Sequence, residues 1–260
     1  MIVRPGTMDQ PKSVQRLGFG SKFASGRGMH TDNPIFPGTP TAEPFDIDEV
    51  FRRLRVILAG MAKAAMFDLR DRGYSSPFEQ LVGSLISART RDETTMEVCL
   101  RLFEQARTPE AMAALDEPTI ARLLSGASFP EPKARDLREL SRRIAADHGG
   151  VVPNSMAGLI AFRGVGPKIA ALTLAVGFNH EAIAVDIHVH RIVNRWGYVE
   201  TTSPEATMAA LELKLPRQYW IEINERLVPF GKFVCVGVSP KCSTCPLRSM
   251  CARVGVTSSR

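Results

Sequence analysis

Four of the five cysteines in this chain of 260 residues lie in one short run near its end. The run reads CVGVSPKCSTCPLRSMC, and six, two and five residues separate its cysteines. They are Cys235, Cys242, Cys245 and Cys251. Thiolates are strong metal ligands, and four of them on one loop can wrap a single metal centre. The run is therefore predicted to be a loop built around such a centre.

Two kinds of centre use thiolate ligands of this type. Zinc sites pair two short Cys-x₂₋₄-Cys units from separate knuckles, whereas only Cys242 and Cys245 form a short pair here. A cubane [4Fe–4S] cluster is wider and binds through cysteine alone, and the run contains no histidine. The spacing favours iron–sulfur, with zinc as the alternative. The fifth cysteine, Cys99, lies on an apolar helical face and is predicted to be a core residue.

The chain beyond Pro44 has the periodicity of helices. Apolar residues recur at helical spacing in nearly every segment, and no run shows the sustained alternation of a strand. Helix start signals stand at Asp46, Ser76, Thr108 and Ser203, each followed by Pro or Glu in the first turn. The run EAIAVDIHVHRIV is the one candidate strand, but helical signals flank it. We therefore predict an all-α chain.

The composition of the chain indicates where the protein works in the cell and what kind of partner it binds. Residues 1–44 hold six of the 18 prolines and six of the 20 glycines, which predicts a disordered tail; an organelle presequence is the weaker reading. No run reaches the roughly 18–20 apolar residues of a membrane helix, and the start lacks the apolar core of a secretory signal. With few cysteines outside the run, we expect a cytoplasmic protein. Lys and Arg outnumber Asp and Glu by 33 to 27, which favours a polyanionic partner.

A second group of residues lies in LIAFRGVGPKIAALTLAVGF, residues 159–178. Gly164 and Gly166 are predicted to turn the chain between two helices, so that backbone N–H groups point outward and can hold a phosphate. Lys168 falls in the first turn of the second helix, where the helix dipole disfavours its charge and favours a nucleophilic amine. Asp186, eighteen residues later, could take up the proton. The simpler alternative is a lysine that contacts phosphate and an aspartate that caps a helix.

The order of these pieces resembles the endonuclease III family, bifunctional DNA glycosylases of the helix-hairpin-helix–Gly/Pro–Asp superfamily. The match runs from about Phe45 to Cys251, and the cysteine spacing is its most specific mark. The resemblance implies two helical domains that flank a DNA cleft. A six-helix barrel with the helix-hairpin-helix would cover residues 72–180. An iron–sulfur cluster domain would combine residues 45–71 with residues 181–260.

The resemblance also implies roles for single residues. Lys168 would form a Schiff base with the sugar and Asp186 would be the superfamily's aspartate. The implied function is removal of oxidised pyrimidines from duplex DNA and β-elimination at the abasic site, in association with the nucleoid. We expect a monomer, because the sequence shows no additional apolar helix face that requires a partner. The implied DNA contacts are Gly164, Val165, Gly166 and His188. The implied ligands of a [4Fe–4S] cluster are Cys235, Cys242, Cys245 and Cys251, on a loop that would hold Lys232, Lys241 and Arg248 against phosphate.

Two positions differ from the family pattern, and a third carries a residue of the type that the family has there. Arg89 stands where the family usually has a glutamine that fills the gap left by a flipped base. Phe129 stands at the position of a bulky apolar wedge residue, and Arg163 replaces a proline before the hairpin. Arginine could fill the gap or read the opposite base, but it could also block the pocket or pair with Asp92. We expect both Arg89 and Phe129 to contact DNA.

Two rival functions fit parts of the sequence. A monofunctional glycosylase would lack Lys168, and the adenine-specific branch needs an acidic residue that residues 80–91 do not contain. A DNA-binding lesion or redox sensor with little catalysis is supported by Arg89 alone. The presence of both Lys168 and Asp186 argues against it. A structural zinc protein would leave that pair unexplained.

Overall fold

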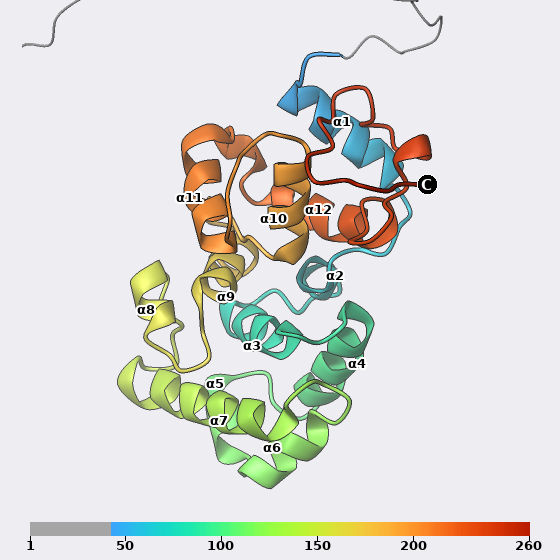
Figure 1. Cartoon of the computed structure of the whole chain (residues 1–260). Coiled ribbons are helices and arrows are strands. Elements are labelled where there is room, and N and C mark those ends of the chain that lie inside the picture. The colour runs from blue at the N-terminus through green and yellow to red at the C-terminus, as the bar shows by residue number, and fades with distance from the viewer. Residues whose placement is uncertain (1–42) are drawn as a thin grey trace, which may run out of the picture. The chain divides into compact units, whose positions relative to one another are not determined.

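The computed structural model describes residues 43–260, so nearly all of the predicted tail lies outside the described residues. The described part forms twelve α-helices and no strand, which confirms the prediction of an all-α fold (Figure 1). A π-helical turn, η1 (Thr173–Gly177), and two 3-10 turns, η2 (Arg217–Tyr219) and η3 (Cys242–Thr244), complete it. The α-helices are α1 (Ile47–Ile57), α2 (Ala65–Asp71), α3 (Pro77–Ser87), α4 (Asp92–Phe103), α5 (Pro109–Ala114), α6 (Glu117–Leu123), α7 (Pro130–Asp147), α8 (Met156–Ile160), α9 (Pro167–Leu172), α10 (Ile187–Arg195), α11 (Pro204–Lys214) and α12 (Glu222–Phe233).

The predicted helix starts act as caps. The Asp46 carboxylate accepts backbone N–H groups in the first turn of α1. Ser76 and Glu79 form a reciprocal capping box: Glu79 N donates to Ser76 Oγ at 3.2 Å, and Ser76 N donates to Glu79 Oε2 at 3.0 Å. Thr108 and Ser203 each accept one N–H in the same way. Each cap satisfies donors that a helix N-terminus leaves free, which is why these helices begin there.

The candidate strand is an irregular buried segment. Residues 182–185 are buried without regular structure, and α10 begins two residues later. The residues of this run are apolar because they are buried between helices, and they form no sheet.

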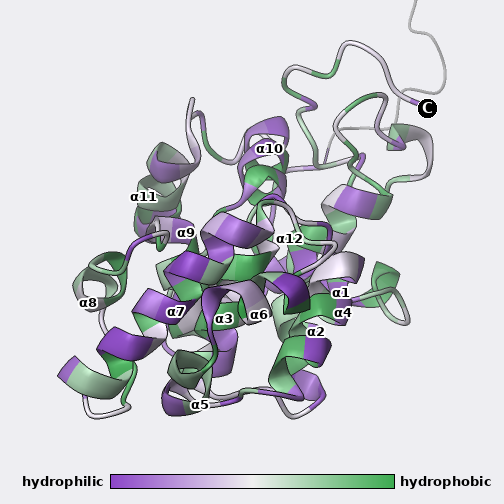
Figure 2. Cartoon of the chain, turned by 90° about the horizontal axis from the view of Figure 1, so that it is seen from below, coloured by the Kyte–Doolittle hydropathy of each residue, from purple (hydrophilic) through white to green (hydrophobic). Residues whose placement is uncertain are grey.

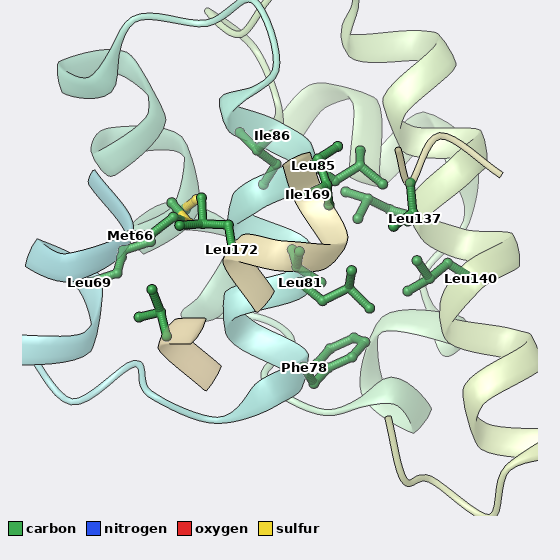
Figure 3. Close-up of a cluster of buried hydrophobic side chains, with 14 of the residues drawn as sticks. Met66, Leu69, Phe78, Leu81, Leu85, Ile86, Leu137, Leu140, Ile169 and Leu172 are labelled. Carbon is green, nitrogen blue, oxygen red and sulfur yellow. The ribbon is translucent and has the colours of Figure 1, made fainter. Parts of the chain in front are cut away.

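Buried apolar side chains form two clusters. The first is drawn from the helices between α2 and α9, with η1, and Figure 3 shows its centre, where side chains of α2, α3, α7 and α9 meet. The second is drawn from α1, α10, α11, α12 and the cysteine run. In Figure 1 α1 lies beside the C-terminal loop, and Arg53 Nη1 donates to the carbonyl of Pro246 at 2.9 Å. The second cluster is therefore assembled from both ends of the described chain.

The helix α2 packs with the first cluster. We expected residues 45–71 to belong with the cysteine run, and α1 does so. The buried residues of α2, such as Met66 and Phe67, lie in the first cluster instead. The domain boundaries themselves stay a prediction.

Polar and apolar residues are interleaved along the helices. Figure 2 shows both kinds on most of them, as expected where one side of a helix is buried and the other faces solvent. Among the described residues, no helix has the length and apolar character needed to cross a bilayer.

Candidate active site

A hairpin joins α8 to α9, as the sequence predicts. Gly164 has a φ of +81°, and a Cβ there would lie 3.0 Å from Asp136 Oδ2, so a side chain would be both strained and crowded. Val165 is buried and anchors the turn in the first cluster. A Cβ on Gly166 would meet nothing within 4 Å. The hairpin therefore has a fixed inner side and an open outer side at the start of α9.

Lys168 and Asp186 line the same small pocket, with a volume of about 40 Å³. Lys168 comes from the first turn of α9, and Asp186 from the residue before α10. The structure thus brings together two predicted residues from helices that lie in different apolar clusters. The rest of the wall consists of Ala64, Ala65, Met66, Ser87, Asp92, Leu172, Asn224 and Val228.

The surroundings of the pocket change the pKa of Lys168. Burial lowers the pKa of the Lys168 amine, while the negative charges of Asp186 and Asp92 act in the opposite direction. An amine with a lowered pKa is unprotonated more of the time and is a better nucleophile. Burial is the larger influence, so the surroundings favour the nucleophilic form.

Asp186 has two roles in the structure. Its Oδ1 accepts from the backbone N–H groups of His188 and Val189, both at 2.9 Å, and caps α10. The same carboxylate lines the lysine pocket. The alternative of a simple helix cap is therefore part of the site, because the cap fixes the carboxylate there.

Asp92 is a pocket residue that the sequence analysis missed. Its Oδ2 lies 3.2 Å from Lys232 Nζ, which also lies 2.7 Å from Glu93 Oε1. Lys232, expected to face phosphate, is instead paired with two carboxylates. These ion pairs join the start of α4 to α12. The sequence offers Asp92 only as a partner of Arg89, and the described part of the chain contains no such pair.

His188 does not line the pocket. Its ring packs where α10 meets α12, and Arg191 Nη2 lies 3.1 Å from its Nδ1. A Cβ on Gly231 of α12 would lie 2.5 Å from that same Nδ1. This arrangement gives His188 a packing role between the two helices.

Arg89 and Phe129 come together at the tips of two loops. Both are exposed, and the guanidinium carbon of Arg89 lies 5.9 Å from the centre of the Phe129 ring. Arg163 also faces solvent and places its Nε 3.1 Å from Asp136 Oδ1, behind the hairpin. Arg163 therefore lies inside the turn that Val165 N closes on the Phe162 carbonyl at 3.2 Å, and only its side chain points away to Asp136.

The four clustered cysteines line one pocket. No three His, Cys, Asp or Glu side chains in residues 43–260 form a ready group for a metal ion. The donors around this pocket are nevertheless all sulfur, and its wall includes four cationic residues. Arg195 Nη1 lies 3.5 Å from Cys235 Sγ, and the Arg195 carbonyl accepts from Cys251 Sγ at 3.5 Å. A thiolate-bound cluster fits this donor set: burial raises the pKa of the Cys245 and Cys251 thiols, but a coordinated metal deprotonates the thiols that bind it. The cationic residues are Arg195, Lys241, Arg248 and Arg253.

A buried lysine and an aspartate beside a helix-hairpin-helix are the features of a helix-hairpin-helix DNA glycosylase. Comparison with known proteins agrees with this class. Residues 82–217 match the family described as the HhH-GPD superfamily base excision DNA repair protein. Endonuclease III of Thermotoga maritima is 40% identical over 182 residues, which are 70% of this chain and 85% of that protein. Endonuclease III-like protein 1 of Bos taurus is 31% identical over 250 residues, 92% of this chain and 81% of that one.

A solved structure extends the likeness to three dimensions. "Structure of a Trapped Endonuclease III-DNA Covalent Intermediate: Estranged-Adenine Complex" superposes with a TM-score of 0.70 at 27% identity, covering 80% of this chain and 94% of that one. The chain belongs to the endonuclease III family. It is a DNA glycosylase and abasic-site lyase of base excision repair.

Proposed function

We propose that the protein removes oxidised pyrimidines from duplex DNA and then cleaves the abasic site through a Schiff base on Lys168. The observation that carries this proposal is the buried amine of Lys168, which shares a pocket with the Asp186 carboxylate and lies two residues after the open side of the hairpin at Gly166. The likeness to endonuclease III–DNA complexes, one of them a trapped covalent intermediate, supports double-stranded DNA as the partner.

A damaged base must leave the helix before the pocket can act on it. Flipping costs a few kcal/mol, which contacts to the opened duplex have to offset. The exposed pair of Arg89 and Phe129 supplies a planar cation and an aromatic ring that can stack in the gap. Val165 N already donates to the Phe162 carbonyl at 3.2 Å, so the N–H groups of Gly164 and Gly166 are the ones that hold a backbone phosphate next to the lesion.

The chemistry follows from the lysine and the aspartate. The neutral amine of Lys168 attacks C1′, the bond from C1′ to the base breaks, and the base leaves with the electron pair. The amine proton passes to the Asp186 carboxylate and then to O4′, which takes the electron pair of the C1′–O4′ bond as the sugar ring opens and leaves an imine. Loss of a C2′ proton then expels the 3′ phosphate oxygen, which cuts the strand on the 3′ side of the lesion.

The four cysteines hold a [4Fe–4S] cluster in this proposal. Such a cluster, when bound, supplies a charged structural centre to which the loop is tied. No reaction step runs through it. Metal analysis separates the two alternatives left open by the spacing: iron with acid-labile sulfide and visible absorbance supports the cluster, and one zinc ion per chain refutes it. We also propose that the protein acts as a monomer on cytoplasmic, nucleoid DNA.

Borohydride trapping tests the proposed function. Purified protein is incubated with duplex DNA that carries thymine glycol or an abasic site, and borohydride reduces any imine to a stable covalent complex. We expect trapping with both duplexes, no trapping with Lys168→Ala, and normal trapping with Lys214→Ala, which removes a lysine from α11 away from the pocket. DNA binding without trapping by the unaltered protein would refute the Schiff base and favour a sensor.

A further inference from the structure

The two loops that bear Arg89 and Phe129 share an unusual backbone. Both residues have a φ of 58°, in the left-handed region. Side chains with a Cβ are disfavoured there, and such conformations persist where surrounding contacts enforce them. Neither residue is a glycine or an asparagine, so contacts with neighbouring parts of the protein must stabilise these loop conformations.

Lys133 is the residue that holds the first loop. It is only 7% exposed, and its Nζ donates to the carbonyls of Ile86 and Ala88 at 2.6 and 2.8 Å and to Thr90 Oγ1 at 3.0 Å. An ammonium has three donors, and all three are used. The carbonyls lie at the C-terminus of α3, where the helix dipole favours a cation. Burial lowers the pKa of Lys133 to about 8, while the nearby Cys99 acts weakly in the opposite direction.

Ser128 ties the second loop to the first. Its backbone N–H donates to Thr90 Oγ1 at 3.2 Å, and its hydroxyl donates to the carbonyl of Arg89 at 2.7 Å. Thr90 Oγ1 therefore accepts from both Ser128 and Lys133. Because Ser128 directly precedes Phe129, the two exposed side chains are connected through one network of hydrogen bonds.

We propose that Lys133 is a positioning residue that locks Arg89 and Phe129 into one preformed wedge for the gap left by the flipped base. This inference rests on the proposed function. Lys133 itself touches no DNA in this account. It lies behind the wedge and fixes the geometry in which the two side chains meet the duplex, so that little ordering is needed on binding.

Comparing a single-stranded with a duplex substrate distinguishes effects on the wedge from effects on the Lys168 pocket. Ser87 and Asp92, on either side of the Arg89 loop, line the Lys168 pocket. Cleavage of a single-stranded abasic oligonucleotide needs the pocket but no wedge, because no base stack has to be opened. Base release from a duplex needs both. A residue that acts through the wedge affects only the duplex reaction.

The test compares Lys133→Met with Lys133→Arg. Methionine fills the space without a donor, whereas arginine retains the charge and several donors. We expect Lys133→Met to lower kcat/KM for base release from duplex DNA by about tenfold to a hundredfold and to leave single-strand cleavage unchanged. Lys133→Arg should restore much of the loss. The fluorescence of 2-aminopurine placed opposite the lesion should report weaker unstacking by Lys133→Met.

A double-mutant cycle shows whether Lys133 acts through the wedge. In an Arg89→Ala/Phe129→Ala background, Lys133→Met should cause little further loss. Full additivity, an equal loss on single-stranded DNA, or an unaffected Lys133→Met would each overturn the inference. An unaltered protein that is inactive on every lesion would instead refute the proposed function, and the 2-aminopurine signal would still decide the role of Lys133.

Discussion

Two carboxylates oppose the effect of burial at Lys168. Burial lowers the pKa of the amine, whereas the charges of Asp186 and Asp92 raise it. The reactive form is the neutral amine, so the rate of imine formation rises with pH as Lys168 loses its proton. Any change that removes a negative charge from the pocket lowers the pKa further and brings this rise to a lower pH.

Asp92→Asn should therefore move the rising limb of the pH profile toward lower pH. The measurement is the single-turnover rate of covalent trapping on an abasic duplex across a pH series. Glu93→Gln is the matched control, because Glu93 also pairs with Lys232 but does not line the pocket. A shift toward higher pH, or the same shift in both variants, would show that Asp92 does not act on the Lys168 amine.

Sequence patterns found the residues whose signal is local. Lys168 and Asp186 each stand next to a recognisable turn or cap, and the structure brings them into one pocket. Asp92 and Lys133 were not found, because their importance lies in contacts with α12 and with the end of α3, far along the chain. A buried lysine on a polar-looking helix carries no periodic signal that separates it from a solvated one.

At the scale of elements, α10 and α12 meet at Gly231. A helical glycine normally costs about 1 kcal/mol relative to alanine, so replacing it with alanine usually stabilises a helix. Here the added Cβ would lie 2.5 Å from His188 Nδ1 and 3.0 Å from Arg191 Nη2. The missing side chain is what allows the two helices to approach.

Gly231→Ala should destabilise the protein despite the gain in helix propensity. Overpacking of this kind costs about 1–3 kcal/mol, which should appear as a lower midpoint in urea unfolding. Gly237→Ala serves as the control, since a Cβ at Gly237 would meet nothing within 4 Å. A Gly231→Ala protein as stable as the unaltered one would mean that His188 and Arg191 move aside freely.

Helix starts were the most predictable part of the fold. Caps depend on neighbours within four residues, so Asp46, Ser76, Thr108 and Ser203 could be recognised from the sequence. The placement of α2 in the first apolar cluster could not, since its apolar face suits either cluster and only tertiary packing decides between them. The π-helical turn after α9 likewise left no local signal.

At the scale of the whole molecule, the cysteine pocket connects the last loop to the second apolar cluster. Cys235, Cys245 and Cys251 pack against that cluster, and Leu247 and Met250 between them are buried in it. A ligand that gathers the thiols therefore also holds these apolar side chains in place. Its loss should loosen the loop and the helices beneath it.

Cys242→Ala should lower the bound iron and the thermal midpoint together. We expect a fall of at least about 5 °C, because a loss of 2 kcal/mol or so shifts the midpoint of a domain of this size by that much. Cys99→Ala removes a buried thiol from the first apolar cluster. This variant should retain the iron even if it costs some stability. Unchanged iron content in the Cys242→Ala protein would exclude it as a ligand.

The net charge of +6 should make binding to undamaged duplex DNA sensitive to salt. Each phosphate contact contributes about 0.9 to the slope of log K against log salt concentration. Lys241→Ala should reduce the slope by about this amount, because Lys241 is exposed. Lys232→Ala should leave it unchanged, because Lys232 is paired with Asp92 and Glu93. Equal slopes for both variants would contradict this distinction.

The split origin of the second apolar cluster sets an order for folding during synthesis. Nearly all residues of the first cluster lie between positions 64 and 184, so it can close while the rest of the chain is still being made. The helix α1 leaves the ribosome earlier still, yet its buried face packs against α12 and the cysteine run. A nascent chain must therefore carry an uncovered α1 until translation reaches the last cysteines, and this interval is when it most needs protection from aggregation.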